Sequence, residues 1–484
     1  MKYFQKTPPL SYIKVEIIAT ILISALCWYI SNGLNGDFWY LLWVAPIPVL
    51  LISFKTNYKT TFIVSFFAYL IGRLSWLSYL VSIITVVPTI ILIVLLSIFF
   101  AIVIIVTKKI YIKTNPKYAI FIFPIFFTTF EWVLIKFSPD GTAASIAYSQ
   151  SDLLALVQIA SVTGILGITF IVTFIPSVLA LSWHHYKETN KLLSTTIPSF
   201  IFIVLVFLFG IVRISSSPEK NSTTVGLVVL NENTHSINSV DFQNEIQHIK
   251  NYAQEITELA KQGARLVVLP ERAININEDI DTISINILSE TAKQHHITIV
   301  TGYTNFKKGR VRNASLVIDT SGKIVLDYDK VHLVKVLEDR FTSGSEIGLF
   351  KFNDLQAGTA ICKDLDFPEY VRKYGTNKAI FLCIPAWDFV KDDWLHSRMA
   401  ILRGVENGFS EIRTARQGRL TISDYYGKVN AEANSSMGQK NTLIGQVSLI
   451  RINTIYAQYG DWFGITIIIT AILFVLLSNL PRKK

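Results

Sequence analysis

The stretch Arg265-Leu-Val-Val-Leu-Pro-Glu271 joins an apolar, strand-like run to a carboxylate at its end. Two later stretches place a reactive side chain similarly: Leu326-Asp-Tyr-Asp-Lys330 ends on a lysine, and Ala357-Gly-Thr-Ala-Ile-Cys362 ends on a cysteine. Because α/β folds usually place their sites where strands end, Glu271 and Cys362 are candidate site residues. Together with Lys330 they supply a carboxylate, an ammonium and a thiol, the groups needed to cleave an ester or amide through a covalent thioester.

The segment around these residues, 215–461, predicts one α/β domain, because strand-like runs alternate with runs of helical periodicity. The expected strands are Thr224–Leu230, Arg265–Leu269, Ile297–Gly302, Thr359–Ile361 and Ala379–Ile384, and the expected helices are Asp241–Gln262 and Ile285–His296. The stretches Asn313–Asp319 and Lys323–Tyr328, separated by Ser321-Gly322, predict a β-hairpin.

The rest of the 484-residue chain is dominated by long apolar blocks, and the whole chain is 51% hydrophobic and only 17% charged. A block of about 20 residues can cross the roughly 30 Å hydrocarbon core of a membrane. Eight spans are predicted, at residues 15–31, 38–53, 60–80, 82–106, 118–137, 164–183, 196–214 and 462–480. The second block is short and contains Pro46 and Pro48, so we expect it to be broken or tilted.

These blocks divide the chain into a membrane domain of seven helices at 1–214, the α/β domain at 215–461, and a C-terminal helix with a tail at 462–484. Basic residues gather at both termini and in the loops after the second, fourth and sixth blocks, namely Lys2, Lys6, Lys55, Lys59, Lys108, Lys109, Lys113, Lys117, Lys187, Lys191, Arg482, Lys483 and Lys484. Such a bias predicts cytoplasmic termini and an extracytoplasmic α/β domain. It also explains the net charge of +10 without a nucleic-acid partner.

Two charged residues interrupt the predicted spans, Arg73 in the third and Glu131 in the fifth. Charges inside a membrane are costly and usually face a partner or a wet cavity, although side chains near helix ends can also reach the interface. Both interpretations stay open from the sequence. The segment Gly141–Gln158 is too polar for a span, and it predicts a re-entrant or interfacial segment on the outer face, near the place where a lipid would enter.

The three cysteines, Cys27, Cys362 and Cys383, form neither a disulfide framework nor a paired CxxC zinc signature. Cys383 lies within the apolar run Phe381-Leu-Cys-Ile384, which indicates a buried packing role. A disulfide between Cys383 and Cys362 stays possible in an oxidising compartment, and it would inactivate the Cys362 thiol. The eight histidines are scattered, so the sequence predicts neither a metal site nor a cofactor.

Each of the three candidate residues alone has an ordinary explanation. Glu271 can be a surface charge, Lys330 can pair with Asp329, and Cys362 can be a small core residue. Their order and their flanking residues are more specific than any one of them. The case for a site therefore depends on the motifs that contain them.

Four motifs of the α/β segment resemble those of the nitrilase, or carbon–nitrogen hydrolase, superfamily, which uses a Glu-Lys-Cys triad in an αββα sandwich. They are Leu269-Pro-Glu271, Tyr328-Asp-Lys-Val-His-Leu333, Ile361-Cys362 and Arg403-Gly-Val-Glu-Asn407. With eight predicted spans, the whole chain resembles the apolipoprotein N-acyltransferase family. Four segments of the membrane part support this narrower resemblance: Phe130-Glu-Trp132, the region of Gly141, Tyr148-Ser-Gln150 and Gly164-x-x-Gly167.

The resemblance implies that Cys362 is the nucleophile, Glu271 the general base and Lys330 the group that stabilises the oxyanion, with Glu338 as a further site glutamate. It implies a glycerophospholipid acyl donor, the α-amine of a diacylglyceryl-cysteine lipoprotein as acceptor, and a place in the bacterial inner membrane. We expect a ping-pong acyltransferase that acts as a monomer. Two alternatives are a membrane-anchored amidase that acts on a soluble or cell-envelope amide, and a non-catalytic lipid-binding protein.

The sequence departs from the family pattern beside the cysteine and near Trp387. Lys363 and Asp364 stand where the family usually has an aromatic residue and a glutamate, and Ile384-Pro-Ala-Trp387 replaces the more common Asn-Asp-x-Trp. We expect Lys363, Asp364 and Trp387 to contribute to substrate binding or to accessory contacts. Lys363 either lowers the pKa of the Cys362 thiol as a neighbouring cation or points away into solvent, and the second is favoured.

Overall fold

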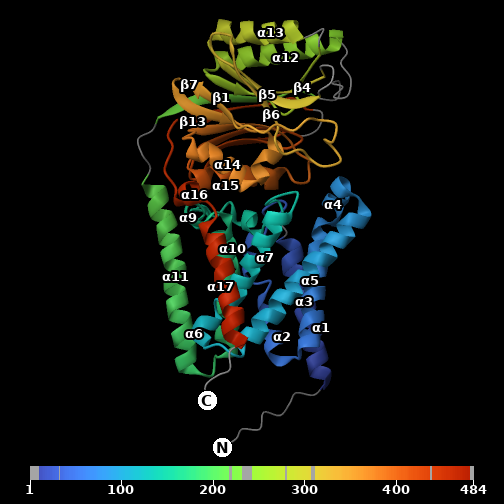
Figure 1. Ribbon diagram of the computed structural model, residues 1–484, viewed down its shortest axis with the longest axis vertical. Coiled ribbons are helices and arrows are strands. Elements are labelled where there is room, and N and C mark those ends of the chain that lie inside the picture. The colour runs from blue at the N-terminus through green and yellow to red at the C-terminus, as the bar shows by residue number, and fades with distance from the viewer. Residues whose placement is uncertain are drawn as a thin grey trace, which may run out of the picture.

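The computed structural model describes residues 10–31, 33–216, 221–231, 242–277, 281–306, 311–435 and 439–479. A helical domain forms one half of the molecule, and a two-sheet domain stacks on it end to end (Figure 1). The expected positive N-terminus with Lys2 and Lys6, and the tail with Arg482, Lys483 and Lys484, lie outside the described residues.

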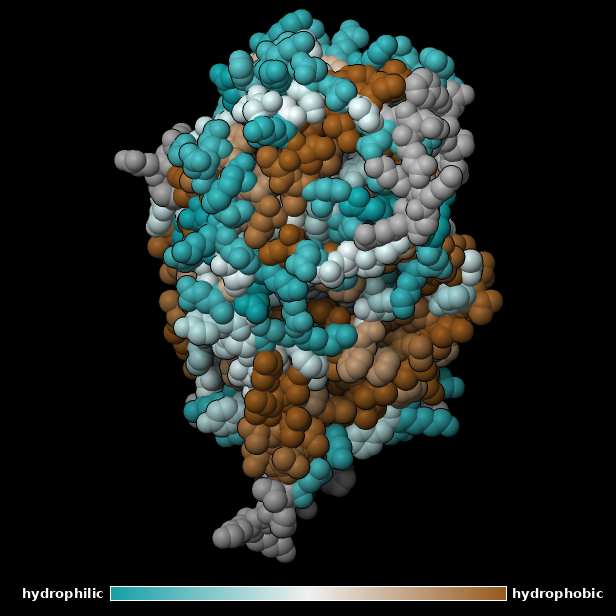
Figure 2. Space-filling model, turned by 45° about the horizontal axis from the view of Figure 1, so that its top comes forward, coloured by the Kyte–Doolittle hydropathy of each residue, from teal (hydrophilic) through white to brown (hydrophobic). Residues whose placement is uncertain are grey.

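Within the described residues, seven helical segments are long and apolar enough to cross a membrane: Ile13–Ile30, Tyr58–Ile84, Val86–Tyr111, Lys117–Phe137, Ile165–His184, Leu192–Ser215 and Trp462–Asn479. They comprise α1 (Leu10–Ile30), α3 (Tyr58–Arg73), η2 (Leu74–Trp76), α4 (Leu77–Ile84), α5 (Val86–Tyr111), α6 (Pro116–Ala119), α7 (Ile122–Phe137), α10 (Ile165–His184), α11 (Thr189–Ser215) and α17 (Trp462–Asn479). Each coincides with one of the predicted blocks. Hydrophobic side chains dominate the visible surface of this half (Figure 2).

The second predicted block differs from the other seven. It forms a 3-10 helix, η1 (Trp39–Trp43), followed by the short helix α2 (Ile47–Lys55), and the apolar stretch Trp39–Lys55 falls below the length of a full span. Pro46 caps α2 and Pro48 lies in its first turn. Proline lacks the N–H that would continue a preceding helix, so the break occurs where the two prolines predicted it.

The polar segment folds into two stacked β-sheets. One sheet has the order β13-β1-β2-β4-β5-β6, with β3 also paired to β4, and the other has the order β12-β11-β10-β9-β8-β7. The strands of the first sheet are β1 (Ser222–Val229), β2 (Leu266–Val268), β3 (Ile274–Ile276), β4 (Thr298–Asn305), β5 (Arg312–Ile318), β6 (Ile324–Asp329) and β13 (Asn441–Ser448). Those of the second are β7 (Gly348–Phe352), β8 (Leu355–Thr359), β9 (Phe381–Trp387), β10 (Ser410–Arg416), β11 (Arg419–Ser423) and β12 (Val429–Asn434).

Helices cover both outer faces of the stacked sheets, which gives the expected αββα sandwich. Helices α12 (Phe242–Lys261) and α13 (Asp281–His295) lie on the far side, and α14 (Pro368–Thr376) and α15 (Asp393–Asn407) lie between the sheets and the helical domain (Figure 1). Helix α12 buries Ile249, Tyr252, Ile256 and Leu259, whose spacing puts them on one face. Residue Asp241, the predicted start of this helix, lies outside the described residues.

The two sheets pack together through a hydrophobic core that fixes where their strand ends point. Val225, Leu266 and Val300 of the first sheet pack in one cluster with Phe381 and Ile412 of the second. Strand β2 is buried throughout, as expected for a parallel strand covered on both faces. The carboxyl ends of β2 and β8 are therefore held in place by packing, and the candidate residues that follow them are on a rigid base.

Candidate active site

The structure brings Glu271, Lys330 and Cys362 together from three separate strand ends. Glu271 follows β2, Lys330 directly follows β6, and Cys362 opens a 3-10 turn, η4 (Cys362–Asp366), after β8. The Lys330 Nζ lies 2.7 Å from Glu271 Oε1 and 2.8 Å from Glu338 Oε2. Glu271 is 3% exposed and Lys330 is 1% exposed, so this is a buried ion-pair network.

Asn313, at the start of β5, holds both glutamates in place. The sequence did not predict that Asn313 is a site residue. Its Nδ2 donates to Glu271 Oε1 at 2.6 Å and to Glu338 Oε1 at 2.6 Å. Glu338 also accepts a hydrogen bond from the backbone N–H of Val334 at 2.7 Å. The only feature of the sequence that marks Asn313 is a polar side chain at the start of an apolar strand. This feature does not predict that its amide group contacts Glu271 and Glu338.

The electrostatics of the network separate the two glutamates. Burial raises the pKa of Glu271 even against the attraction of Lys330. Burial also opposes ionisation of Glu338. The attraction of Lys330 and the hydrogen bonds that Glu338 accepts nevertheless lower the pKa of Glu338. For Lys330, burial alone would lower the pKa, yet the two carboxylates raise it well above its usual value. Glu338 is thus the carboxylate that stays ionised as the counter-ion of Lys330, and Glu271 is the one suited to exchange a proton.

Cys362 adopts a left-handed backbone conformation with φ at 44°, which is strained for a residue with a side chain. Its Sγ donates to the backbone carbonyl of Trp387 at 3.5 Å. Burial, with the charge of Glu271, raises the pKa of the Cys362 thiol well above its usual value, and Lys330 offsets this in part. The raised pKa favours the neutral thiol over the thiolate.

Lys363 does not take the solvated position that the sequence favoured. Its side chain is 8% exposed, forms an ion pair with Asp140 of the helical domain, and lies 4.0 Å from Asp366 Oδ2. The ammonium group of Lys363 is thus paired with the carboxylates of Asp140 and Asp366 beside the cysteine. Lys363 and Asp366 are buried where the two domains meet, which the sequence alone does not show, and this is the reason for the difference.

Asp364 is fully buried and connects the lysine segment to the cysteine turn. Its Oδ1 accepts hydrogen bonds from the backbone N–H groups of Val331 and His332 at 3.2 and 2.8 Å. Its Oδ2 accepts from the Ile361 N–H at 3.0 Å and from the Tyr328 hydroxyl at 2.6 Å. Asp364 thereby fixes the spacing between Lys330 and Cys362, and it does not line the cavity described below.

Trp387 closes the other side of the thiol at the end of β9. The guanidinium groups of Arg416 and Arg272 lie 4.4 and 5.4 Å from the centres of its rings. The next residue, Asp388, receives two hydrogen bonds from Arg413, at 2.9 and 2.5 Å. Arg416 and Arg272 stack on the Trp387 ring, and Arg413 holds the neighbouring Asp388. Together they keep the Trp387 backbone carbonyl beside the Cys362 Sγ.

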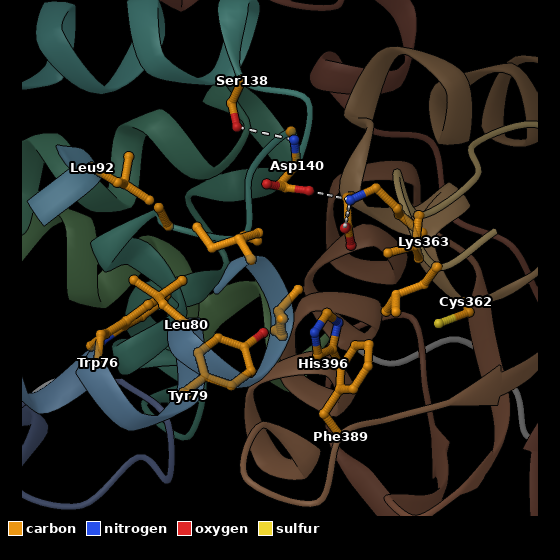
Figure 3. Close-up of a pocket in the computed structure, with 18 of the residues that line it drawn as sticks. Trp76, Tyr79, Leu80, Leu92, Ser138, Asp140, Cys362, Lys363, Phe389 and His396 are labelled. Carbon is orange, nitrogen blue, oxygen red and sulfur yellow. Dashed lines mark hydrogen bonds and ion pairs between the residues drawn. The ribbon is translucent and has the colours of Figure 1, made fainter. Parts of the chain in front are cut away.

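A cavity of about 590 Å³ joins these residues to the helical domain. On the helical side much of its wall is aliphatic, formed by Leu80, Ile83, Leu92, Leu96 and Leu134. On the other side it is lined by Glu271, Lys330, Cys362, Lys363 and Trp387. Figure 3 shows Trp76, Leu80 and Leu92 facing Cys362 and Phe389 across this space, with Tyr79 and His396 between them.

Arg73 and Glu131 also line this cavity, and both are buried. Arg73 donates to the Tyr69 hydroxyl at 2.8 Å, and Glu131 accepts from the Ile146 N–H at 2.7 Å. The segment Gly141–Gln158 forms η3 (Ile146–Gln150) and α8 (Leu154–Val157), and it contacts the sandwich through hydrogen bonds of Tyr148 with Arg403 and of Gln158 with the Tyr426 carbonyl. The two charges therefore support the cavity wall and its flanking loop.

The other cysteines take no part in this site. Cys27 and Cys383 are buried free thiols, and Cys362 is also free, so the possible disulfide is not formed. Cys383 packs in the core between the sheets, as its sequence indicated. Across the described part of the chain, no cluster of three or more His, Cys, Asp or Glu side chains could hold a metal ion.

Comparison with known proteins agrees with the two-part architecture. The carbon–nitrogen hydrolase family matches residues 225–481, and the apolipoprotein N-acyltransferase N-terminal domain matches residues 24–178. The apolipoprotein N-acyltransferase of Rickettsia prowazekii is 24% identical, covering 76% of this chain and 78% of that protein. The enzyme of the same name from Geobacter metallireducens is 22% identical and covers 88% of each chain.

Among solved structures, an amidase from a Nesterenkonia species is 17% identical with a TM-score of 0.41, covering 50% of this chain and 95% of that chain. The family matches cover the sandwich and most of the helical domain, in the same order as the two halves of the structure. The chain belongs to the carbon–nitrogen hydrolase family and, within it, to the apolipoprotein N-acyltransferases.

Proposed function

We propose that this protein transfers an acyl chain from a membrane glycerophospholipid, through a thioester on Cys362, to the α-amine of a diacylglyceryl-cysteine lipoprotein. The observation that carries the proposal is the single cavity that joins an aliphatic wall from the helical domain to Cys362, Glu271 and Lys330. A soluble amide needs no such wall. The acyl chain of a lipid does, because its methylene groups are costly to expose to water.

In the first half-reaction, Glu271 accepts the proton of the Cys362 thiol while Sγ attacks the ester carbonyl of the donor. The raised pKa of Glu271 suits this role, because a stronger base removes a proton from a thiol whose own pKa is raised. The ammonium of Lys330 stabilises the negative charge that develops on the carbonyl oxygen. The carbon–oxygen bond then breaks, and the lysophospholipid alkoxide takes the proton back from Glu271.

In the second half-reaction, the neutral amine of the acceptor attacks the thioester carbonyl. The tetrahedral intermediate collapses with loss of the Cys362 thiolate, and the new amide forms. The proton released by the amine passes through Glu271 to the thiolate, which restores the resting site. The aliphatic wall excludes water, which would otherwise hydrolyse the thioester.

The same proposal places the sandwich domain on the outer face of the bacterial inner membrane, with both termini in the cytoplasm and the protein active as a monomer. The orientation is supported by the positions of the basic loops, and Figure 1 draws the start of α1 and the end of α17 at the same end of the helical domain, away from the sandwich. A membrane-impermeant thiol reagent should label Cys362 in intact spheroplasts. Labelling that requires lysis would contradict this orientation.

A thioester trap tests the chemistry. The purified protein is incubated with phospholipid that carries a labelled acyl chain, and hydroxylamine-sensitive label on the protein is measured for the wild type and for Cys362→Ala. We expect label on the wild type alone, and its transfer to a diacylglyceryl lipopeptide with a free amine. An unlabelled wild-type protein refutes the mechanism, and label that is released only to water identifies a hydrolase.

A further inference from the structure

The cysteine turn η4 is held from the side of the helical domain by the loop Ser138–Ser145, which joins α7 to η3. Asp140 of this loop forms the ion pair with Lys363, the residue directly after Cys362. Figure 3 shows this pair at the cavity, between the helical domain and Cys362. Both residues line the cavity, so the contact between the two domains is also part of the wall of the active site.

The last residue of the turn is held just as closely. The backbone carbonyl of Asp366 accepts hydrogen bonds from the Thr142 N–H at 3.0 Å and from the Thr142 hydroxyl at 2.9 Å. Gly141 has φ at 50°, and a Cβ added there would lie 2.3 Å from the Asp366 carbonyl oxygen. A side chain at position 141 therefore has no room, and the close approach of the loop to the turn depends on glycine.

The loop is itself fixed by buried contacts. The Tyr148 hydroxyl donates to Thr142 Oγ1 at 2.6 Å, and it accepts from Arg403 Nη2 of α15 at 2.7 Å. Arg403 is fully buried. The Asp140 N–H donates to Ser138 Oγ at 3.0 Å, which closes the start of the loop. The loop is thus a rigid support and not a loose connection.

Cys362 needs such support because its left-handed backbone is strained. A residue with a side chain in this conformation costs on the order of 1–3 kcal/mol and persists where its neighbours hold it. The sandwich holds one side of the turn through Asp364. The helical domain holds the other side through Lys363 and Asp366.

We propose that Asp140, Gly141 and Thr142 are positioning residues for the nucleophile, so that the helical domain completes the active site and is more than an anchor. The effect on acyl transfer rests on the proposed function. The effect on the geometry of the thiol does not, because it can be measured with a small alkylating reagent. A displacement of about 1 Å at a reacting atom is sufficient to cost about 100-fold in rate.

The chain offers a matched control for Asp140. Asp152, twelve residues further along, also forms an ion pair between the helical domain and a buried cation of the sandwich, Arg398, at 3.1 Å. The side chains of Asp140 and Asp152 are 55% and 52% exposed, and Lys363 and Arg398 are 8% and 9% exposed. Arg398 does not line the cavity and also forms an ion pair with Glu432, so the Asp152 pair joins the same two domains away from the site.

The test compares Asp140→Asn, Gly141→Ala and Asp152→Asn in the full-length protein. Three quantities are measured: the rate of hydroxylamine-sensitive acylation, the rate of Cys362 alkylation by iodoacetamide, and the melting temperature. We expect Asp140→Asn and Gly141→Ala to slow acylation at least tenfold and to change the alkylation rate at least threefold, and Asp152→Asn to change each rate less than twofold. The double variant Asp140→Lys with Lys363→Asp should recover at least tenfold over either single variant.

Equal acylation and alkylation rates in Asp140→Asn and the wild type would overturn the proposal. Equal slowing by Asp140→Asn and Asp152→Asn would also overturn it, because both ion pairs would then act only by holding the two domains together. A double variant as slow as its parents would contradict the direct pairing of Asp140 with Lys363. Should the wild type take no acyl label, the proposed function fails. The alkylation rates then still decide whether the loop positions the thiol.

Discussion

Asp364→Asn is the sharpest test of how the site is assembled, because Asp364 joins the lysine segment to the cysteine turn. Its carboxylate accepts from the backbone N–H groups of Val331, His332 and Ile361 and from the hydroxyl of Tyr328, at distances of 2.6 to 3.2 Å. In the asparagine variant, Oδ1 can keep the contacts to Val331 and His332. The new Nδ2 then faces the Ile361 N–H, and two donors oppose each other.

The cost of this variant can be worked from the contacts that are lost. One buried backbone N–H left unsatisfied costs about 1–3 kcal/mol, and the loss of the carboxylate charge weakens the remaining bonds by about 1 kcal/mol. The total is about 2–4 kcal/mol. For a domain of roughly 150–250 residues, each kcal/mol lowers Tm by about 2–4 °C, so we expect Tm to fall by about 5–15 °C.

Thermal unfolding in detergent and the thioester trap measure the two consequences together. We expect acylation to slow more than tenfold while the KM for the donor stays within about twofold, since Asp364 does not line the cavity. Asp319→Asn is the control: this carboxylate accepts from the backbone N–H groups of Ser321 and Lys323 in the β5–β6 turn, and it should lower Tm by less than about 2 °C. A variant at Asp364 that keeps its Tm and raises KM would refute the reasoning and make Asp364 a substrate-binding residue.

Three further predictions concern the network around the thiol. Gly302→Ala should slow acylation at least about 100-fold in the thioester trap, because its Cβ would lie 2.6 Å from the Cα of Glu271 and displace that carboxylate. The acylation rate should rise with pH as Glu271 loses its proton. Lys330→Met should move the midpoint of this pH profile to higher pH, because Lys330 lowers the pKa of Glu271. An unchanged midpoint would exclude this coupling between Lys330 and Glu271. Burial alone would lower the pKa of His396, but Asp392 raises it to about 9, so protonation stabilises the fold below about pH 6.5 and this contribution is lost as pH rises through about 9. The Tm difference between the wild type and His396→Gln should therefore shrink between pH 6 and pH 9.5, and a constant difference would contradict it.

The elements that the sequence predicted correctly are those whose patterns are local. The hairpin of β5 and β6 was predicted from two strand-like runs around Ser321-Gly322, and the structure pairs these strands antiparallel. Seven apolar blocks became long helices because length and composition alone determine this outcome. The break at the second block was predicted because Pro46 and Pro48 act on their own backbone.

Contacts between distant segments could not be predicted in this way. Asn313 meets Glu271 across 42 positions, and Lys363 meets Asp140 across 223, so no spacing in the sequence links either pair. The solvated interpretation of Lys363 was wrong because a lysine beside a cysteine has no sequence signal for a partner in another domain. Asp364 was expected to contribute to substrate binding or to accessory contacts, and its hydrogen bonds to the backbone after β6 and after β8 depend on how these two segments meet in the fold.

The aliphatic wall also favours a lipid donor over a soluble amide. An acyl chain that moves from the bilayer into the cavity exchanges one apolar environment for another, so the wall of Leu80, Leu92 and Leu134 adds little affinity. It removes a cost instead, since each methylene group drawn into water would lose about 0.8 kcal/mol. A soluble amide pays no such cost and gains nothing from the wall. The wall therefore has a physical purpose if the substrate comes from the membrane, and the loop that carries Asp140 brings that wall and the nucleophile into one site.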